Sequence, residues 1–491
     1  MLEKYLKTIY DKYYNLNKDT DFMCDRDIIE FVYFLSKYQI ENKAFKDLVS
    51  EYKNQKKDKY RQYLNLESPD EFFSERDTLH FTYPFYETFK RLDVLYEMIG
   101  KKKWEEIFGY SYELLYCVVT VIICRIVLFY NNYRQINDID ERKEYEKINL
   151  YATTCYFTKE EIYNSFVGYR TEIDKILDDI SIDFYKQDNI KDSCSILKVD
   201  NQYYLFFIWD FLYNLYDKYS KKIKSSLGND EFNNKRGKTF ENLCYNNLKK
   251  TFPQFEIYKS LEYDYNKGNH EIDLLMQLEE TIVVFECKSS SFDTYESSID
   301  GKLYNDFLKA YGRGYKTIND LNDFIKLGNN IFRTKDGKKV SFDFSKYKVV
   351  YVNLSLYNIE YLQTNVQKID SSKIKPVEVY PICWNYIDFL TLTKVACVDY
   401  ELFENYFNKR FNMINKNKNL TFDYDEVDVF GFLTDPSYQE FYNNILMPTV
   451  EKGNSIDMNF MISNGAYRQE FNKHLDIDYL YGFIEKNNRE N

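Results

Sequence analysis

Two carboxylates and a lysine lie in apolar, strand-like segments near the middle of the 491-residue chain. Asp273 lies in the segment EIDLLMQL, and Glu286 and Lys288 lie at the end of the segment TIVVFECK. A buried strand usually carries apolar side chains, because a buried charge is costly unless it is paired or binds a metal. These three residues therefore indicate a functional site.

The two segments are predicted to form a β-hairpin. Both are rich in Val, Ile and Leu, and Glu279-Glu280 between them has the length of a two-residue turn. With that turn Asp273 lies opposite Glu286, and strand alternation places Lys288 on the same face. A three-residue turn would shift the register by one and move Asp273 to the far face.

Opposed carboxylates repel each other unless a cation lies between them. The oxygens of Asp273 and Glu286 suit Mg²⁺ first and Mn²⁺ second. Such a metal would lower the pKa of a bound water and neutralise charge on a phosphoryl oxygen. Lys288 would orient that water and offset charge in the transition state. The predicted reaction is hydrolysis of a phosphodiester.

The pattern of Asp273, a gap of twelve residues and Glu286-Cys287-Lys288 resembles the PD-(D/E)XK nuclease superfamily, which has the restriction-endonuclease-like fold. Ile272 stands where the family pattern has a proline. The family core runs helix, three strands, helix, strand. In this chain we expect those elements, with one further strand, at residues 233–250, 255–261, 271–278, 281–288, 302–324, 347–354 and 378–383.

The resemblance also implies roles for residues outside the hairpin. Glu241, on the first helix, would add a third carboxylate to the metal site, and Arg313 or Lys316, on the second, would bind the scissile phosphate. DNA is favoured over RNA as the substrate by the habits of the family. The implied protein is a Mg²⁺-dependent endonuclease of bacterial defence against phage or mobile DNA.

Two other functions remain open from the sequence. One is a nucleic-acid-binding or scaffolding protein whose nuclease fold has lost activity, and the other is an RNase that uses the same site. Neighbours of the motif have more ordinary interpretations. Glu271 is expected to form a salt bridge with Lys288, His270 to act in the turn or in proton transfer, and Cys287 to lie in the core.

Charge is unevenly distributed around the motif, although the whole chain has a net charge of −12. Residues 221–260 and residues 301–340 each hold nine Lys or Arg against four Asp or Glu. Residues 261–300 hold two against ten. Cation-binding carboxylates beside phosphate-binding cations would produce this pattern, and so would ordinary surface charge.

The segment 327–340 carries four basic residues and two glycines, which predicts a turn or a hairpin tip. Its basic residues would contact a nucleic-acid backbone or simply face solvent. They are Arg333, Lys335, Lys338 and Lys339.

The chain is expected to have an α/β fold in three regions. Residues 1–225 would be a mainly helical accessory domain, 226–400 the nuclease domain with a mixed sheet, and 401–491 a mainly helical C-terminal region. Helices are expected at 27–45, 85–107 and 203–219, and a polar linker is expected at 221–237.

Several classes of partner are disfavoured by the sequence. It has no phosphate-cradling glycine loop, so we expect no ATP hydrolysis. Nine scattered cysteines and three histidines lack zinc-site spacing, which favours reduced thiols in the cytoplasm. The apolar segment 114–130 carries Arg125, which favours a buried helix over a membrane span. A homodimer that places two sites on opposite DNA strands is one possible use of the helical regions.

Overall fold

A computed structural model describes the chain in two compact units, residues 82–232 and 233–457. Both combine helices and strands, so the expected α/β class is confirmed. The described residues are 82–134, 156–183, 196–199, 202–205, 208–289, 313–357, 361–364, 366, 379–397, 399–416, 420–422, 425–451 and 456–457.

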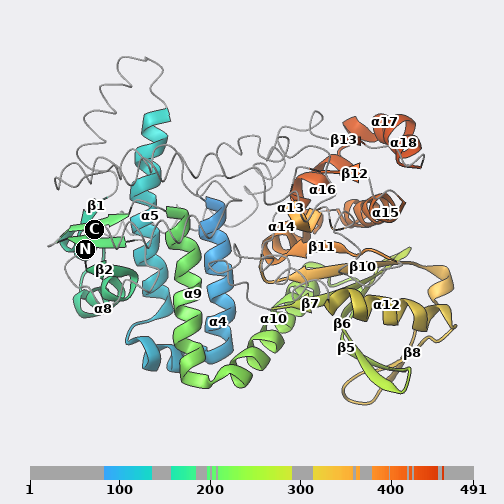
Figure 1. Ribbon diagram of the computed structural model, residues 1–491, viewed down its shortest axis with the longest axis horizontal. Coiled ribbons are helices and arrows are strands. Elements are labelled where there is room, and N and C mark those ends of the chain that lie inside the picture. The colour runs from blue at the N-terminus through green and yellow to red at the C-terminus, as the bar shows by residue number, and fades with distance from the viewer. Residues whose placement is uncertain are drawn as a thin grey trace, which may run out of the picture. The chain divides into compact units, whose positions relative to one another are not determined.

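Three long helices dominate the first unit and lie side by side (Figure 1). Inside them Trp104 stacks on Tyr219 with ring centroids 5.5 Å apart, and the Tyr219 hydroxyl lies 2.7 Å from that of Tyr110. The helices are α4 (Thr82–Phe108), α5 (Tyr112–Arg134) and α9 (Ile208–Leu227). The short helices are α7 (Lys159–Ser165) and α8 (Arg170–Ile180).

The first unit also holds a four-stranded sheet in the order β1-β4-β3-β2, which the sequence did not predict. Each strand has only three or four residues, too few to show a period-2 pattern. The expected helix at 203–219 is therefore wrong at its start, because β4 occupies its first residues. The strands are β1 (Tyr156–Thr158), β2 (Ser181–Asp183), β3 (Ile196–Val199) and β4 (Gln202–Leu205).

The expected linker at 221–237 is wrong. Helix α9 continues to Leu227, and α10 (Asn229–Thr251) begins two residues later. Gly228 separates them with φ +86°, a backbone conformation that favours glycine. Most polar residues of this segment lie on exposed helix faces, while Ile223, Phe232 and Arg236 are buried. The expected helix at 27–45 lies outside the described residues.

The apolar segment 114–130 lies within α5, as expected for a helix. Its side chains Leu115, Val118 and Val119 are buried. Within the described ranges no single helix is long and apolar enough to cross a membrane. The pair Phe85–Phe108 and Tyr112–Ile123, bent by 77°, passes the same test of length and composition.

A seven-stranded mixed sheet forms the centre of the second unit, in the order β11-β10-β7-β6-β5-β8-β9. Strand β10 is parallel to both β7 and β11, and the other pairs are antiparallel. The strands are β5 (Glu256–Tyr265), β6 (Gly268–Gln277), β7 (Thr281–Lys288), β8 (Ile331–Arg333), β9 (Lys339–Ser341), β10 (Lys348–Ser355) and β11 (Ile382–Asn385).

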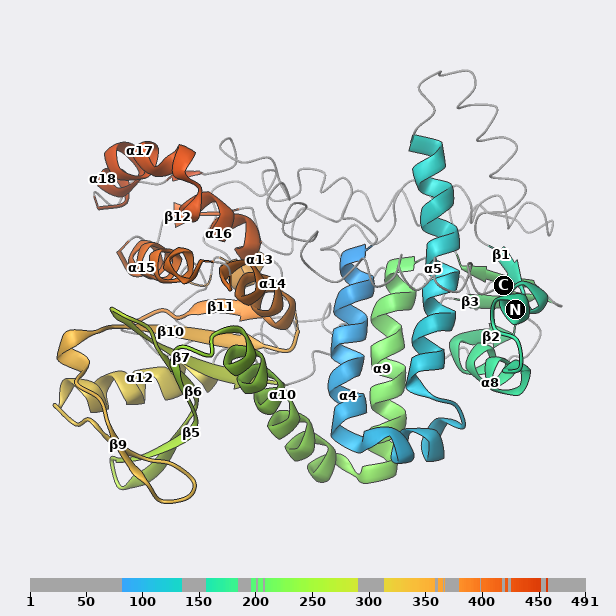
Figure 2. The same ribbon diagram turned by 180° about the vertical axis from the view of Figure 1, so that it is seen from behind.

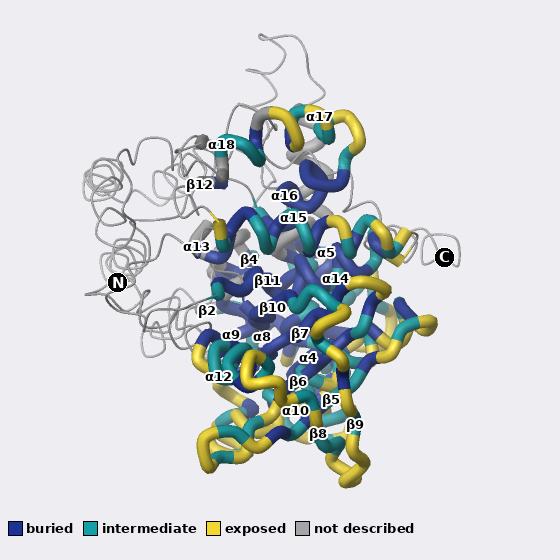
Figure 3. The backbone as a smooth tube through the Cα atoms, turned by 90° about the vertical axis from the view of Figure 1, so that its right-hand side faces the viewer, coloured by how far each residue is buried: buried dark blue, intermediate teal, exposed yellow. Residues whose placement is uncertain are grey.

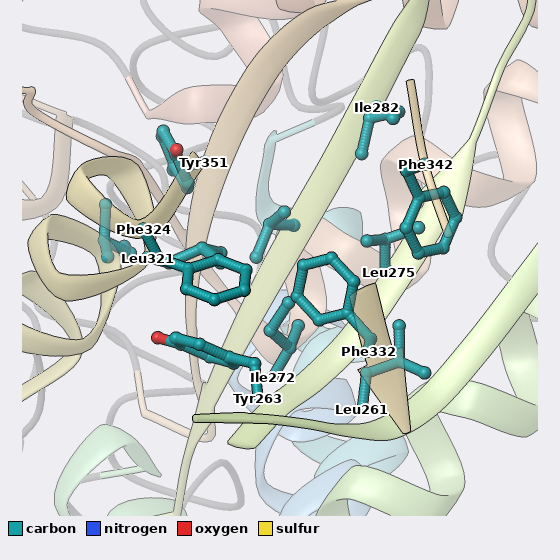
Figure 4. Packing of buried hydrophobic residues seen from close by; sticks show 12 residues of the cluster. Leu261, Tyr263, Ile272, Leu275, Ile282, Leu321, Phe324, Phe332, Phe342 and Tyr351 are labelled. Atoms are coloured by element: carbon teal, nitrogen blue, oxygen red, sulfur yellow. The ribbon is translucent and has the colours of Figure 1, made fainter. Parts of the chain in front are cut away.

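Helices cover both faces of this sheet. Helix α12 (Arg313–Lys326) packs on one face over the apolar cluster in Figure 4, where Leu321 and Phe324 approach Tyr263 and Ile272. The other face is covered by α10, which lies in front of the sheet in Figure 2, and by α14 (Tyr386–Ala396). There the Phe240 and Tyr386 rings are 5.2 Å apart.

The elements α10, β5, β6, β7, α12 and β10 follow one another in the order expected from the sequence. Several boundaries differ. Strand β5 runs to Tyr265 rather than to residue 261, β6 begins at Gly268 rather than at residue 271, and β11 begins at Ile382 rather than at residue 378. Helix α12 is described only from Arg313. The segment 327–340 forms the predicted hairpin, in which β8 and β9 are antiparallel.

The region after residue 400 belongs to the same unit as the sheet. Phe403 of α15 packs against Trp384 of β11, with ring centroids 5.7 Å apart. The expected separation at residue 400 therefore does not appear in the structure. The remaining elements are α13 (Tyr361–Thr364), α15 (Tyr400–Lys416), α16 (Glu426–Thr434), α17 (Gln439–Phe441), α18 (Met447–Glu451) and the paired β12 (Leu420–Thr421) and β13 (Ile456–Asp457).

Candidate active site

The hairpin register is the one that a two-residue turn predicts. Leu278 donates its amide to the carbonyl of Thr281 at 2.8 Å. The ladder then runs outward to the pair of Leu274 and Phe285. Asp273 is the next residue on β6, so it lies at the end of the ladder beside the carboxyl end of β7.

Asp273 lies where the sheet is locally distorted. Its carboxylate Oδ2 accepts the amide of Cys287 at 2.7 Å, in place of a strand carbonyl. On the other side, β5 has Ser260 at φ +54° opposite Asp273. Ile272 and Leu275, three residues apart, belong to the same apolar cluster (Figure 4), so strand alternation breaks between them. The distortion presents Asp273 to the neighbouring strand end.

Glu286 and Lys288 lie on the face that α12 covers. Glu286 is 5% exposed, and its Oε1 bonds the Lys288 ammonium. A second hydrogen bond joins Glu286 to the side chain of Thr317 on α12. Strand β7 thus supplies both charged groups, and the helix holds one of them in place.

Glu241 reaches the same cluster from α10. Its charge interacts with that of Asp273 and, in the opposite sense, with that of Lys259. Helix α10 directs its buried stripe, including Cys244, towards β7, where Cys244 contacts Cys287. Glu241 lies one helical turn before Cys244, and this position places it at the edge of the site.

Burial and mutual repulsion shift the protonation of these carboxyl groups. Burial, and then the charge of Asp273, raise the pKa of Glu241 to about 7 and that of Glu286 to about 8. Burial also raises the pKa of Asp273, although Lys288 and the Cys287 amide act against it. Burial lowers the pKa of Lys288, but Glu286 and Asp273 outweigh this effect and raise it overall.

Lys288 hydrogen-bonds Glu286, and the charges of Lys259 and Lys335 also act on the other carboxyl groups of the cluster. The pKa values of the carboxyl groups are nevertheless raised, so the site favours holding protons, or a cation in their place, near neutral pH. Oxygen donors of this kind suit a hard divalent cation. Among the described side chains, however, no group of three or more Asp, Glu, His or Cys residues is arranged as a formed metal site. Lys288 lies against the Glu286 oxygen that a metal would use.

Glu271 has a different partner from the one expected. It forms an ion pair with Lys335 at 3.2 Å, not with Lys288. The β6–β7 ladder ends at Leu274, so the register that would bring Glu271 to Lys288 does not extend that far. Instead Glu271 pairs across the sheet with Glu262 on β5 and faces the β8–β9 hairpin.

The other predicted residues lie around the cluster or beyond it. Lys316 is exposed on α12, and no contact described for it joins it to the carboxylates. Arg313 is the first residue of that helix, and its side chain lies outside the described part of the structure. The His270 ring lies 3.2 Å from the Tyr265 carbonyl and 3.9 Å from Asp320, which matches a turn residue. Cys287 is buried, as expected.

Sequence reasoning missed Thr317, and it identified Lys335 only as part of a basic segment. A threonine in an amphipathic helix carries no sign that it will bond a carboxylate on a strand. The signal for Lys335 was its predicted hairpin, which pairs through β8 with β5 of the seven-stranded sheet.

Comparison with protein-family models, with curated proteins and with solved structures finds no match. The resemblance to PD-(D/E)XK nucleases therefore depends on the motif and on the order of the elements around it.

Proposed function

We propose that this protein is a metal-dependent nuclease with a restriction-endonuclease-like domain, which hydrolyses phosphodiester bonds of DNA. One observation supports this proposal most strongly. Asp273, Glu286, Glu241 and Lys288 come from three elements and meet at one strand end, with more negative charge than Lys288 can balance. Burying such a cluster is costly, and this cost is accepted mainly at functional sites.

Each residue has a role in this proposal. Asp273 and Glu286 would hold Mg²⁺, with Glu241 as a further oxygen donor, and Mn²⁺ would substitute. The bound metal would activate water and neutralise phosphoryl charge. Lys288, which bonds Glu286 Oε1, would stabilise negative charge on the phosphate. Arg313 and Lys316 remain proposed phosphate contacts.

The biological setting is proposed by analogy alone. A nuclease unit joined to a helical unit, in a chain without a phosphate-cradling ATP motif, suits cytoplasmic defence against phage or mobile DNA. A homodimer would place two sites on opposite strands.

A second function is favoured by a specific observation. The described residues contain no formed metal site, and Lys288 lies against Glu286. A nucleic-acid-binding protein without catalysis would keep such a hydrogen bond between Lys288 and Glu286. An RNase would use the same residues on another substrate.

Cleavage of supercoiled plasmid DNA tests the proposal. The full chain is incubated with Mg²⁺, Mn²⁺ or EDTA, beside Asp273→Ala and Lys288→Ala. We expect metal-dependent nicking that each substitution lowers by at least about 100-fold, the usual effect of losing a charge-stabilising group. Matched controls are Asp343→Ala and Lys346→Ala, which break an exposed ion pair of 3.2 Å in the same unit.

The controls should cleave like the unchanged chain, and thermal melting should show that all variants are folded. Cleavage that survives Asp273→Ala would overturn the assigned site. If RNA is cut and DNA is not, the RNase function replaces the DNase. If neither is cut, the binding function replaces both.

A further inference from the structure

The β8–β9 hairpin ends in a well-formed basic tip. The Thr334 amide bonds the Lys338 carbonyl at 2.9 Å, and the Gly337 amide bonds the Thr334 carbonyl at 2.8 Å. Gly337 takes φ +83°, which the turn requires. Residues 335–339, KDGKK, are all exposed, and this part of the chain appears yellow beside β8 and β9 in Figure 3.

The base of the hairpin is attached to the catalytic sheet. Arg333 pairs with Glu262 of β5, and its guanidinium binds both oxygens of Asp264 at 2.8 and 3.0 Å. Glu262 in turn pairs with Glu271 of β6. Glu271 precedes Asp273 by two residues, so the hairpin is positioned at the level of the candidate site.

Lys335 extends from this tip towards the carboxylates. Its ammonium lies 3.2 Å from Glu271 Oε1, and the two side chains are 60% and 40% exposed. Its charge also acts on Glu241 and Asp273 and opposes the rise in their pKa values. Lys335 is thus a basic residue beside the cluster that also faces solvent.

Binding of a phosphodiester at this site requires a basic residue near the carboxylates. A phosphodiester that approaches this site is repelled by the ionised carboxylates among Asp273, Glu286, Glu241 and Glu271 unless cations offset their charge. An ion pair as exposed as that of Lys335 and Glu271 adds little stability, so a phosphate can replace Glu271 at little cost. Lysine contacts to phosphates supply much of the affinity of DNA-binding proteins.

We propose that Lys335 binds a phosphate of duplex DNA beside the candidate active site, and that it exchanges Glu271 for that phosphate when the DNA binds. This inference depends on the proposed function for the identity of the substrate. It adds the hairpin tip, which begins 47 residues after Lys288 along the chain, as the surface that contacts the DNA backbone.

Binding measured without cleavage tests the exchange. A fluorescent DNA duplex is titrated with the full chain in EDTA at several salt concentrations, beside Lys335→Ala and Glu271→Gln. We expect Lys335→Ala to weaken binding several-fold and to reduce the log–log salt slope by about 0.9, the value for one lost phosphate contact. Glu271→Gln should tighten binding, because Lys335 loses its competing partner.

Lys346→Ala is the matched control, because it breaks an ion pair of equal length, 3.2 Å, that is also exposed. It should leave both the dissociation constant and the salt slope unchanged. If Lys335→Ala behaves like Lys346→Ala, or if Glu271→Gln does not tighten binding, the inference is overturned. Plasmid cleavage by the same samples separates this failure from that of the proposed function. Duplex binding that depends on Lys335 without any cleavage would support the inference and contradict hydrolysis.

Discussion

The site is defined at the residue scale by a shortage of positive charge. Lys288 bonds Glu286, while Asp273 takes the Cys287 amide and Glu241 approaches from α10. Burial is the largest cause of the raised pKa values of all three carboxyl groups, and the charge of Asp273 raises those of Glu241 and Glu286 further. A proton or a metal ion would relieve the same repulsion, so the two should compete for the site.

Glu286→Gln should stabilise the protein increasingly as the pH rises. The pKa of Glu286 is raised from 4.5 to about 8 in the folded state, so between these values the folded chain holds a proton that the unfolded chain lacks. The free energy of unfolding therefore falls as the pH rises through this window. Glutamine mimics the protonated form of Glu286 at every pH, so the variant does not lose this stability as the pH rises.

The measurement is the melting temperature of variant and unchanged chain from pH 5 to pH 8.5. We expect little difference at pH 5 and a gain of at least about 1 kcal/mol, or about 2–4 °C, above pH 8. Glu280→Gln, at the exposed hairpin turn, is the control and should show a constant difference. A Glu286→Gln difference that does not change with pH would contradict this account.

At the element scale, α12 is positioned by a close approach to the sheet. Gly314 lies near its start, where a Cβ atom would be 2.5 Å from Asn353 Nδ2 on β10. Asn353 is fully buried and pairs across the sheet with Glu286, which Thr317 of α12 bonds. The small residue thus lets α12 lie close enough to hold Glu286.

Gly314→Ala should destabilise the protein by about 1–3 kcal/mol, because the added methyl group collides with the fully buried side chain of Asn353. Gly237→Ala, inside α10, is the matched control. Its Cβ would meet its nearest neighbour, Ser289 Oγ, at 3.7 Å, so we expect a gain of about 0.5–1 kcal/mol from helix propensity. Denaturation by urea gives both values. Equal effects of the two substitutions would contradict the close packing of α12.

At the scale of the whole molecule, the region after residue 400 completes the unit that holds the site. Arg410 of α15 bonds both oxygens of Glu426 on α16, at 2.6 and 3.0 Å, and the Thr364 carbonyl at 2.6 Å. Arg410 and Glu426 are both essentially inaccessible to solvent. Arg410 thus joins α15 to α16 through a buried ion pair, and to Thr364 of α13 through a hydrogen bond.

Arg410→Met should cost about 3–5 kcal/mol, because it leaves the Glu426 charge buried without its partner. Lys346→Met breaks an exposed pair and should change stability by at most about 0.5 kcal/mol. Chemical denaturation followed by far-UV circular dichroism compares them. A small effect of Arg410→Met would mean that the C-terminal helices do not stabilise this unit.

Local features allowed the hairpin to be predicted from the sequence. Apolar strands and a two-residue turn determine the register from neighbouring residues, so Asp273 could be placed at the end of β7 beside Glu286. The order of helices and strands followed from the same periodicities. The linker was mispredicted because the polar residues of an exposed helix face resemble those of a loop.

The sequence by itself determined which residue types meet at the motif, because strand alternation and turn length act over a few residues. Only the tertiary structure decided their further partners: Thr317 for Glu286, Lys335 for Glu271, and Glu241 beside Asp273. These contacts join residues on different elements, and they depend on how helices and strands pack. A small change in how a helix packs on a strand gives a side chain a different contact partner. The local sequence pattern does not show which partner it will contact.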